Sequence, residues 1–189
     1  MKPLHKISSI LVQKGFIAEG DRDLYEYGID ILFYTLWSTV VLLLIGIILH
    51  CLIPTAIMIT FFYILQSSGG GYHAKSHFRC LFGMIAGLLT GLSFQFLEKW
   101  AFILWFLLII SFCSLLIIPI VLHPNKNYLN DDIPKFAKRS RTITGILGIL
   151  AVFIVVFLKL PLYPFSAVFF LAACSRISGM SAYKKQAVS

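Results

Sequence analysis

A polar stretch between two apolar runs, residues 66–80, carries the side chains best suited to covalent chemistry. It reads QSSGGGYHAKSHFRC and includes His73, His77 and Cys80. A cysteine thiolate is a nucleophile, and a histidine is the base that usually activates it. Cys80 follows two cations closely and lies where the next apolar helix is expected to begin, and both settings favour the thiolate. Cys80 is therefore a candidate nucleophile, and the alternative from residue types alone is a cysteine that only packs, beside histidines in the membrane interface.

The residues alone leave open which histidine is the base. His77 lies three positions before Cys80 and shares a helix face with it if the helix includes both. His73 lies seven positions before Cys80, which on one continuous helix separates the backbones by about 10 Å along the axis. His73 can therefore act only if the chain folds back. The glycines at 69–71 would give the freedom to do so, and Ser76 is expected to be the N-cap of the following helix.

A zinc site is the alternative chemistry for the same residues. His73, His77 and Cys80 have the spacing H-x3-H-x2-C, and three protein ligands plus water would form a zinc-dependent membrane hydrolase. Against it, no nearby Glu offers the general base that zinc proteases place beside their histidines. The remaining cysteines fall at different expected depths and are not expected to form disulfides: Cys51, Cys113 and Cys174.

The composition requires lipid as the solvent for most of this chain. Of its 189 residues, 59% are hydrophobic and 13% are charged, with a mean hydropathy of +0.88. A soluble domain is about half apolar and about a quarter charged. The predicted fold is therefore all-α, a polytopic helical membrane protein. The net charge of +8 is attributed to basic loops beside membrane lipid, and no nucleic acid is expected as a partner.

Six apolar runs predict six transmembrane helices. The runs are 31–50, 52–66, 81–97, 101–122, 142–158 and 162–177. A span needs about 20 residues, with about 17 as the lower limit, so several runs are short. The pairs that meet near 51–54 and 159–161 would alternatively be re-entrant hairpins, which leaves four spans. Residues 1–28 have an amphipathic pattern that Gly15 and Gly20 interrupt, and they predict a helix in the membrane interface or packed on the bundle.

Charge asymmetry predicts that both termini lie in the cytoplasm. With six spans, Lys99 and Lys159 alone among the 16 basic residues would face outside. The chain is expected to be one membrane domain, 1–189, of a multi-pass cell-membrane protein. Its segments are 1–30 (amphipathic), 31–66 (spans 1–2), 67–80 (catalytic), 81–122 (spans 3–4), 123–141 (basic loop), 142–177 (spans 5–6) and 178–189 (tail). The catalytic segment would then face the cytoplasm.

Two non-enzymatic functions are the alternatives to the hypothesis that this protein is an enzyme. A peptide transporter is expected to carry ionisable residues inside its spans, and the span interiors here carry almost none. A membrane scaffold would use the basic cluster of the 123–141 loop to hold anionic lipid or an acidic partner. That cluster consists of Lys135, Lys138, Arg139 and Arg141.

The run Gly70-Gly71-Tyr72-His73-Ala74-x-Ser76-x-x-x-Cys80, in a polytopic protein of this length, resembles the accessory gene regulator protein B (AgrB) family. The resemblance covers most of the chain and includes a basic N-terminal region and a Pro-Asn-Lys turn at 124–126. It implies a membrane-embedded cysteine endopeptidase of quorum sensing that cleaves a precursor peptide on the cytoplasmic side. Residue by residue, Cys80 matches the family's nucleophile and His73 matches its base.

The resemblance also implies a partner and a reaction. The partner is a short amphipathic, AgrD-like precursor whose C-terminal tail is removed through a Cys80 thioester. A thiol or hydroxyl of the precursor then closes a thiolactone or lactone ring. No cofactor and no metal are implied, and a homodimer is left open. Family members often carry Arg where Gln66 stands, so other basic residues would bind the acidic tail here: Lys75, Arg79 and the cluster Lys135, Lys138, Arg139 and Arg141. The accessory candidates are Ser76, Gly70, Gly71 and Gln66.

Overall fold

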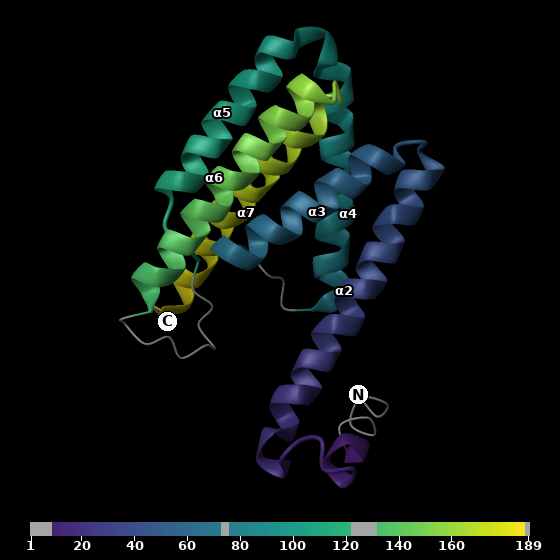
Figure 1. The fold of residues 1–189 in the computed structure, drawn as a ribbon, viewed down its shortest axis with the longest axis vertical. Helices are drawn as coiled ribbons and strands as arrows, with labels where there is room; N and C mark the ends of the chain where they lie inside the picture. The colour runs from purple at the N-terminus through teal and green to yellow at the C-terminus, as the bar shows by residue number, and fades with distance from the viewer. Residues whose placement is uncertain (1–8, 73–75, 122–131, 188–189) are drawn as a thin grey trace. The chain divides into compact units, whose positions relative to one another are not determined.

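The computed structural model describes residues 9–72, 76–121 and 132–187, and these are predominantly helical (Figure 1). The helices are α2 (Arg22–Ile48), α3 (Leu52–Gly69), α4 (His77–Ser93), α5 (Ala101–Ile117), α6 (Ile133–Phe157) and α7 (Tyr163–Ala187), with the 3₁₀ helices η1 (Glu19–Asp21) and η2 (Phe94–Trp100). These ranges contain no strand. The predicted all-α class is confirmed.

Five segments of the described chain are long and apolar enough to cross a membrane. They are Tyr25–Ile48, Leu52–Gly69, His77–Ile117, Ile133–Phe157 and Tyr163–Ala182. The third contains both α4 and α5, because η2 continues the helical backbone while the ribbon bends back on itself (Figure 1). Each of the six predicted apolar runs therefore has its own α-helix. The number of full crossings and the side of each end stay predictions.

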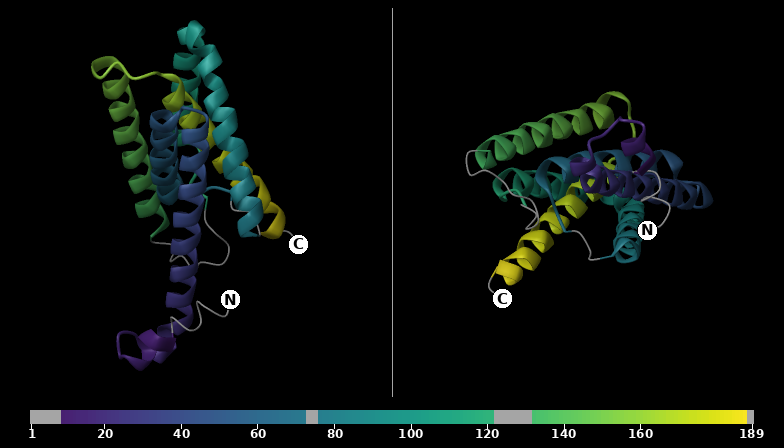
Figure 2. Two further views of the ribbon diagram at one scale, coloured as in Figure 1. Left: turned by 90° about the vertical axis from the view of Figure 1, so that its right-hand side faces the viewer. Right: turned by 90° about the horizontal axis from the view of Figure 1, so that it is seen from below.

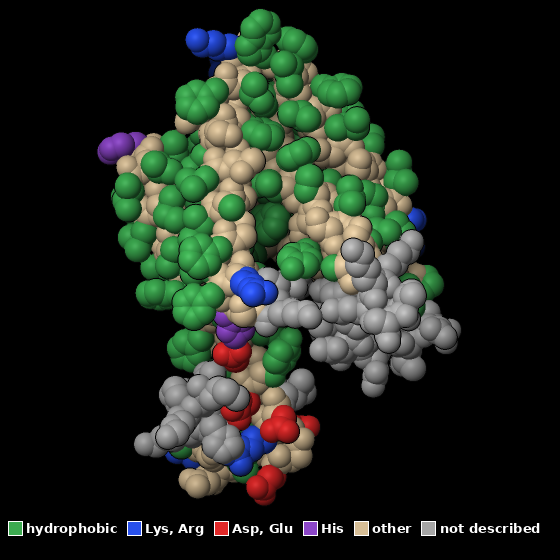
Figure 3. Space-filling view, turned by 180° about the vertical axis from the view of Figure 1, so that it is seen from behind, with side chains coloured by type: hydrophobic (Ala, Val, Ile, Leu, Met, Phe, Trp, Pro, Cys, Tyr) green, Lys and Arg blue, Asp and Glu red, His purple; other side chains and the backbone are tan. Residues whose placement is uncertain are grey.

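Large apolar side chains cover the outside of these helices, as Figure 3 shows for one face. Ile117 is 76% exposed, Ile149 is 74% exposed and Phe157 is 70% exposed. Burying such a side chain away from water is worth about 1.5–3 kcal/mol, so this surface would be costly in water and is suited to lipid. The chain is a polytopic helical membrane protein.

The two predicted breaks between paired runs are confirmed, and each contains a residue in the left-handed conformation. At the end of α2, His50 has φ +54°, the Cys51 N–H donates to Gly46 C=O at 2.8 Å, and the His50 N–H donates to Ile47 C=O at 3.0 Å. These two bonds form a Schellman motif, which satisfies carbonyl groups that the helix end leaves without partners. Lys159, with φ +52°, follows α6.

The chain divides into two compact units, residues 1–44 and 45–189. In the first, the expected amphipathic helix over 1–28 is interrupted. Residues 9–13 are helical, and Gly15 follows them with φ +72°, a conformation that glycine adopts without strain. Arg22, which donates to the Ser9 hydroxyl, begins α2 well before the predicted start of the first span. Residues 1–8 lie outside the described ranges.

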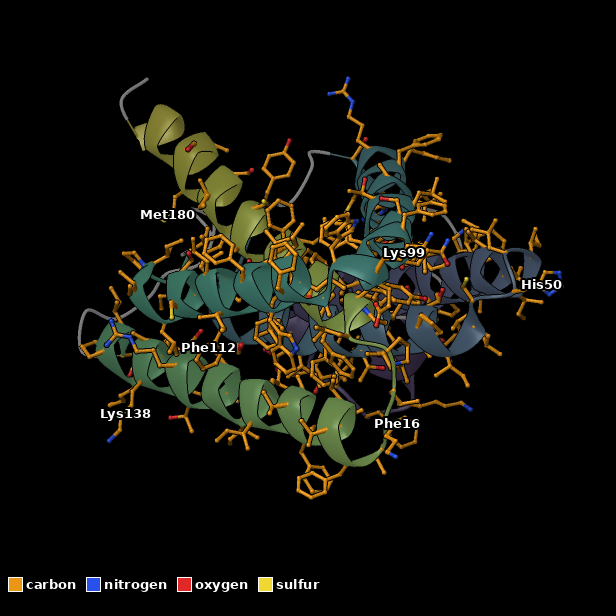
Figure 4. The ribbon with its side chains drawn as sticks, turned by 90° about the horizontal axis from the view of Figure 1, so that it is seen from above. Phe16, His50, Lys99, Phe112, Lys138 and Met180 are labelled. Carbon is orange, nitrogen blue, oxygen red and sulfur yellow. The ribbon has the colours of Figure 1, made fainter. Side chains whose placement is uncertain are left out.

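Helix α7 is the centre of the second unit. It contacts α3, α4, α5 and η2, while α6 contacts α3 and α5 (Figure 1 and Figure 2). Its buried Phe165 meets Phe61 of α3 edge-on at 5.3 Å between ring centroids, and its Phe169 lies 6.1 Å from Phe112 of α5. Phe112 also points toward α6, where it lies over Gly148 (Figure 4).

A carboxylate from η2 holds the start of α7. Glu98 accepts the backbone N–H of Leu162 at 3.1 Å and of Tyr163 at 3.3 Å, one through each oxygen. The first N–H groups of a helix have no partners within it and carry partial positive charge, so a carboxylate there is stabilising. This contact fixes one end of α7, and the candidate site described next lies at the other.

Candidate active site at the start of helix α4

Ser76 is the N-cap of α4, as predicted. Its backbone is extended, with φ −137° and ψ +148°, and its hydroxyl accepts the Arg79 N–H at 3.4 Å. The Cys80 N–H donates to the Ser76 carbonyl at 3.0 Å, so Cys80 lies in the first turn of α4. Its thiol is free and its side chain is half-buried.

The other chemically active residues of the segment are only partly described. His77 and Arg79 are exposed on the first turn of α4, and His77 lies on the same side of the helix as Cys80. His73 and Lys75 lie outside the described residues, so the assignment of His73 as base stays a prediction. Within the described ranges, no three His, Cys, Asp or Glu side chains gather as a metal site, and the zinc alternative depends on His73.

The glycine run, which was expected to let the chain fold back, forms a tightly packed turn. Gly69 is still part of α3, although the segment from 67 was expected to be a loop. Gly70 has φ +68° and ψ +177°, a region that is essentially restricted to glycine. Its N–H donates to Gln66 C=O at 2.9 Å, and a Cβ on Gly70 would overlap the carbonyl of Val121, whose N–H donates to Gly69 C=O at 2.9 Å. Gly70 is required here because its backbone approaches that of Val121 closely.

Helix α7 holds the chain that leaves this turn. The Tyr72 N–H donates both to Ser175 C=O at 3.0 Å and to the Ser175 hydroxyl at 3.2 Å. The Gln66 amide also donates to that hydroxyl, at 2.7 Å. Gly71 is buried, and its backbone lies directly against Gly179. Sequence reasoning missed this role of α7; the small residues at 175 and 179, one helical turn apart, were the available signal.

Arg176 lies inside the bundle, although the charge count places it among the cytoplasmic surface cations. It is 2% exposed, and its guanidinium donates to Leu115 C=O at 2.7 Å and to the Ser140 hydroxyl at 3.3 Å. Leu115 is in the last turn of α5, where carbonyls lack helical partners and the helix end is partially negative. A Cβ on Gly69 would overlap the guanidinium. Arg176 thus ties α7 to α5, α6 and the end of α3.

The basic cluster lies on a helix and not in the predicted loop. Helix α6 begins at Ile133 because Pro134 fits a first helical turn and the residues after it are good helix formers. All four cluster side chains are exposed, and Lys138 points away from α6 in Figure 4. Lys135 forms an ion pair with Asp132 at 3.0 Å. The cluster consists of Lys135, Lys138, Arg139 and Arg141.

Comparison with known proteins places the chain in a family. The family model for accessory gene regulator B matches residues 4–180. Neither the curated proteins nor the solved structures gave a match. The four cysteines all lie in described ranges and are free. The chain therefore belongs to the accessory gene regulator B (AgrB) family, and this membership indicates a role in processing autoinducing peptide precursors.

Proposed function

We propose that this protein is a membrane cysteine endopeptidase in which Cys80 is the nucleophile and His73 is the base. The observation that carries the proposal is the placement of Cys80, in the first turn of a helix that Ser76 caps, within a member of a precursor-processing family. His73 follows directly on a backbone that α7 fixes at Tyr72. A helix turn thus supplies one reacting group, and a separately anchored segment leads to the other.

The proposed reaction has two acyl transfers. His73 accepts the thiol proton, and the Cys80 sulfur attacks the carbonyl carbon of a peptide bond near the precursor's C-terminal end. The C–N bond breaks, the leaving amine takes the proton from His73, and the N-terminal part stays on Cys80 as a thioester. A thiol or hydroxyl of the precursor then attacks this thioester, closes a thiolactone or lactone ring and returns the proton to Cys80. Because hydrolysis competes with ring closure, the site must exclude water.

Exposed cations beside Cys80 and on α6 would bind the acidic tail. Arg79 is exposed one position before Cys80. On α6, Lys138, Arg139 and Arg141 are exposed, whereas Lys135 already has Asp132 as its partner. Long basic side chains with their charge in solvent attract an acidic peptide over about 8 Å at physiological salt. We propose that the acidic tail of the precursor binds at these exposed cations, while the amphipathic segment of the precursor lies on the membrane.

A combination of chelation and alkylation tests the reaction class. The substrate is a short precursor peptide, expected to have an amphipathic start, a central Cys or Ser and an acidic tail and to be encoded by the neighbouring open reading frame. In proteoliposomes, release of the tail is expected to persist after exhaustive treatment with EDTA and phenanthroline. Iodoacetamide is expected to abolish it in a variant that keeps Cys80 and has alanine at the other cysteine positions, 51, 113 and 174. Mass spectrometry of the released tail is the measurement.

Each outcome separates the alternatives. Loss of tail release on chelation, with recovery on adding Zn²⁺, would favour the zinc hydrolase that uses His73, His77 and Cys80. Transport of an intact peptide into the vesicles, without release of a tail, would favour the transporter. Resistance of cleavage to alkylation would contradict a Cys80 nucleophile.

A further inference from the structure

Two positions of α7, Ser175 and Gly179, hold the segment Gly71–Tyr72. Ser175 accepts the Tyr72 N–H twice, at 3.0 Å through its carbonyl oxygen and at 3.2 Å through its hydroxyl oxygen. The same hydroxyl accepts the Gln66 amide at 2.7 Å, which ties it to the last turn of α3. Ser175 thus holds the backbone of Tyr72 and is itself held by Gln66.

Gly179 determines how closely this segment can approach α7. Residues 175 and 179 are one turn apart and lie on the same helix face. A Cβ on Gly179 would lie 2.8 Å from the carbonyl carbon of Gly71 and 2.9 Å from the nitrogen of Tyr72. Both are backbone atoms that no rotamer change can move. A side chain at position 179 would therefore push the segment away from α7 and lengthen the bonds to Ser175.

We propose that Ser175 and Gly179 are positioning residues for the base that activates Cys80, an inference that rests on the proposed function. One peptide bond joins Tyr72 to His73, so we expect a shift of the Tyr72 backbone to be passed on to His73. Cys80 is fixed independently, by the Ser76-capped turn of α4. Helix α7 thus fixes the start of the segment that leads to His73, and a misplacement of about 1 Å at a reacting group costs about 10²-fold in rate.

Matched substitutions in the full-length protein test this inference in proteoliposomes. Ser175→Ala is compared with Ser178→Ala, an exposed serine of the same helix, and Gly179→Ala with Gly145→Ala, where a Cβ meets open space. We expect kcat for tail release to fall about 10-fold in Ser175→Ala and about 100-fold in Gly179→Ala, with KM within about twofold of wild type. Both controls should keep wild-type kcat. Ser175→Thr, which keeps the hydroxyl, should recover at least half of it.

A second readout reports the base directly. In the variant that keeps Cys80 as its one cysteine, the rate of Cys80 alkylation is measured against pH. The pH profile of Gly179→Ala is expected to approach that of His73→Ala. The first variant displaces the base from Cys80 and the second removes the base. The inference is overturned if Ser175→Ala and Gly179→Ala match their controls, or if Ser175→Thr fails to recover kcat. Tail release by Cys80→Ala, run alongside, would instead overturn the proposed function.

Discussion

Replacing Cys80 with alanine is expected to lower the rate of precursor cleavage by at least about 10³-fold, because the reaction loses its nucleophile. The thiol lies half-buried in the first turn of α4. Cleavage is measured as release of the C-terminal tail in proteoliposomes. Cys113→Ala is the matched control, since Cys113 is also a free thiol and lies on α5.

The same assay decides between the two histidines. His73→Ala is expected to abolish cleavage, and His77→Ala is expected to leave most of it, although His77 is on the same helix face as Cys80. The reverse result would make His77 the base, and the reaction would then need no fold-back of the chain between His73 and Cys80. Tail release at the wild-type rate by both Cys113→Ala and Cys80→Ala would show that neither thiol reacts with the precursor.

Replacing Arg176 with alanine is expected to destabilise the fold by about 3 kcal/mol. The change removes two hydrogen bonds from a charged donor and leaves Leu115 C=O without its partner in a site that is closed to water. It also leaves a cavity beside Gly69, which the side chains around it can fill only in part. Unfolding in detergent micelles, followed by tryptophan fluorescence against denaturant, measures the effect.

Arg141→Ala is the matched control for this substitution. Arg141 is an arginine of α6 whose side chain is exposed, so its loss is expected to change stability by less than about 0.5 kcal/mol. Arg176→Lys should lie between the two, because an ammonium group keeps the charge but lacks the planar fork that reaches Leu115 and Ser140 together. Equal stability of the Arg176→Ala and Arg141→Ala variants would contradict a structural role for the buried guanidinium.

Local signals in the sequence were sufficient for the helices and for one end of the site. Six apolar runs correspond to six helices, because the thickness of the hydrocarbon core sets how many consecutive apolar residues a membrane helix needs. Ser76 was predicted as an N-cap and is one. Its hydroxyl accepts a backbone N–H only three residues away, so the signal is local in the sequence. The helix ends were less predictable: α6 and α7 both extend into segments expected to be loop and tail, because charged residues with good helix propensity continue them.

Long-range contacts were beyond the reach of these patterns. The glycines at 69–71 indicated a backbone that is free to turn. Their packing partners, Val121, Arg176 and Gly179, lie far away in the chain. The burial of Arg176 depends equally on distant groups, a carbonyl of α5 and a hydroxyl of α6. Residue type and spacing identify which groups can react or pack closely, and the tertiary structure determines what they meet.

Trapping the acyl-enzyme tests the central claim most directly. A precursor whose internal Cys or Ser is replaced with alanine cannot close its ring, so the thioester on the enzyme should accumulate. In the variant that keeps Cys80 as its one cysteine, mass spectrometry is predicted to find the N-terminal part of the precursor on the peptide that contains Cys80. Hydroxylamine should release it. Tail release without this adduct, or an adduct on another residue, would contradict the account.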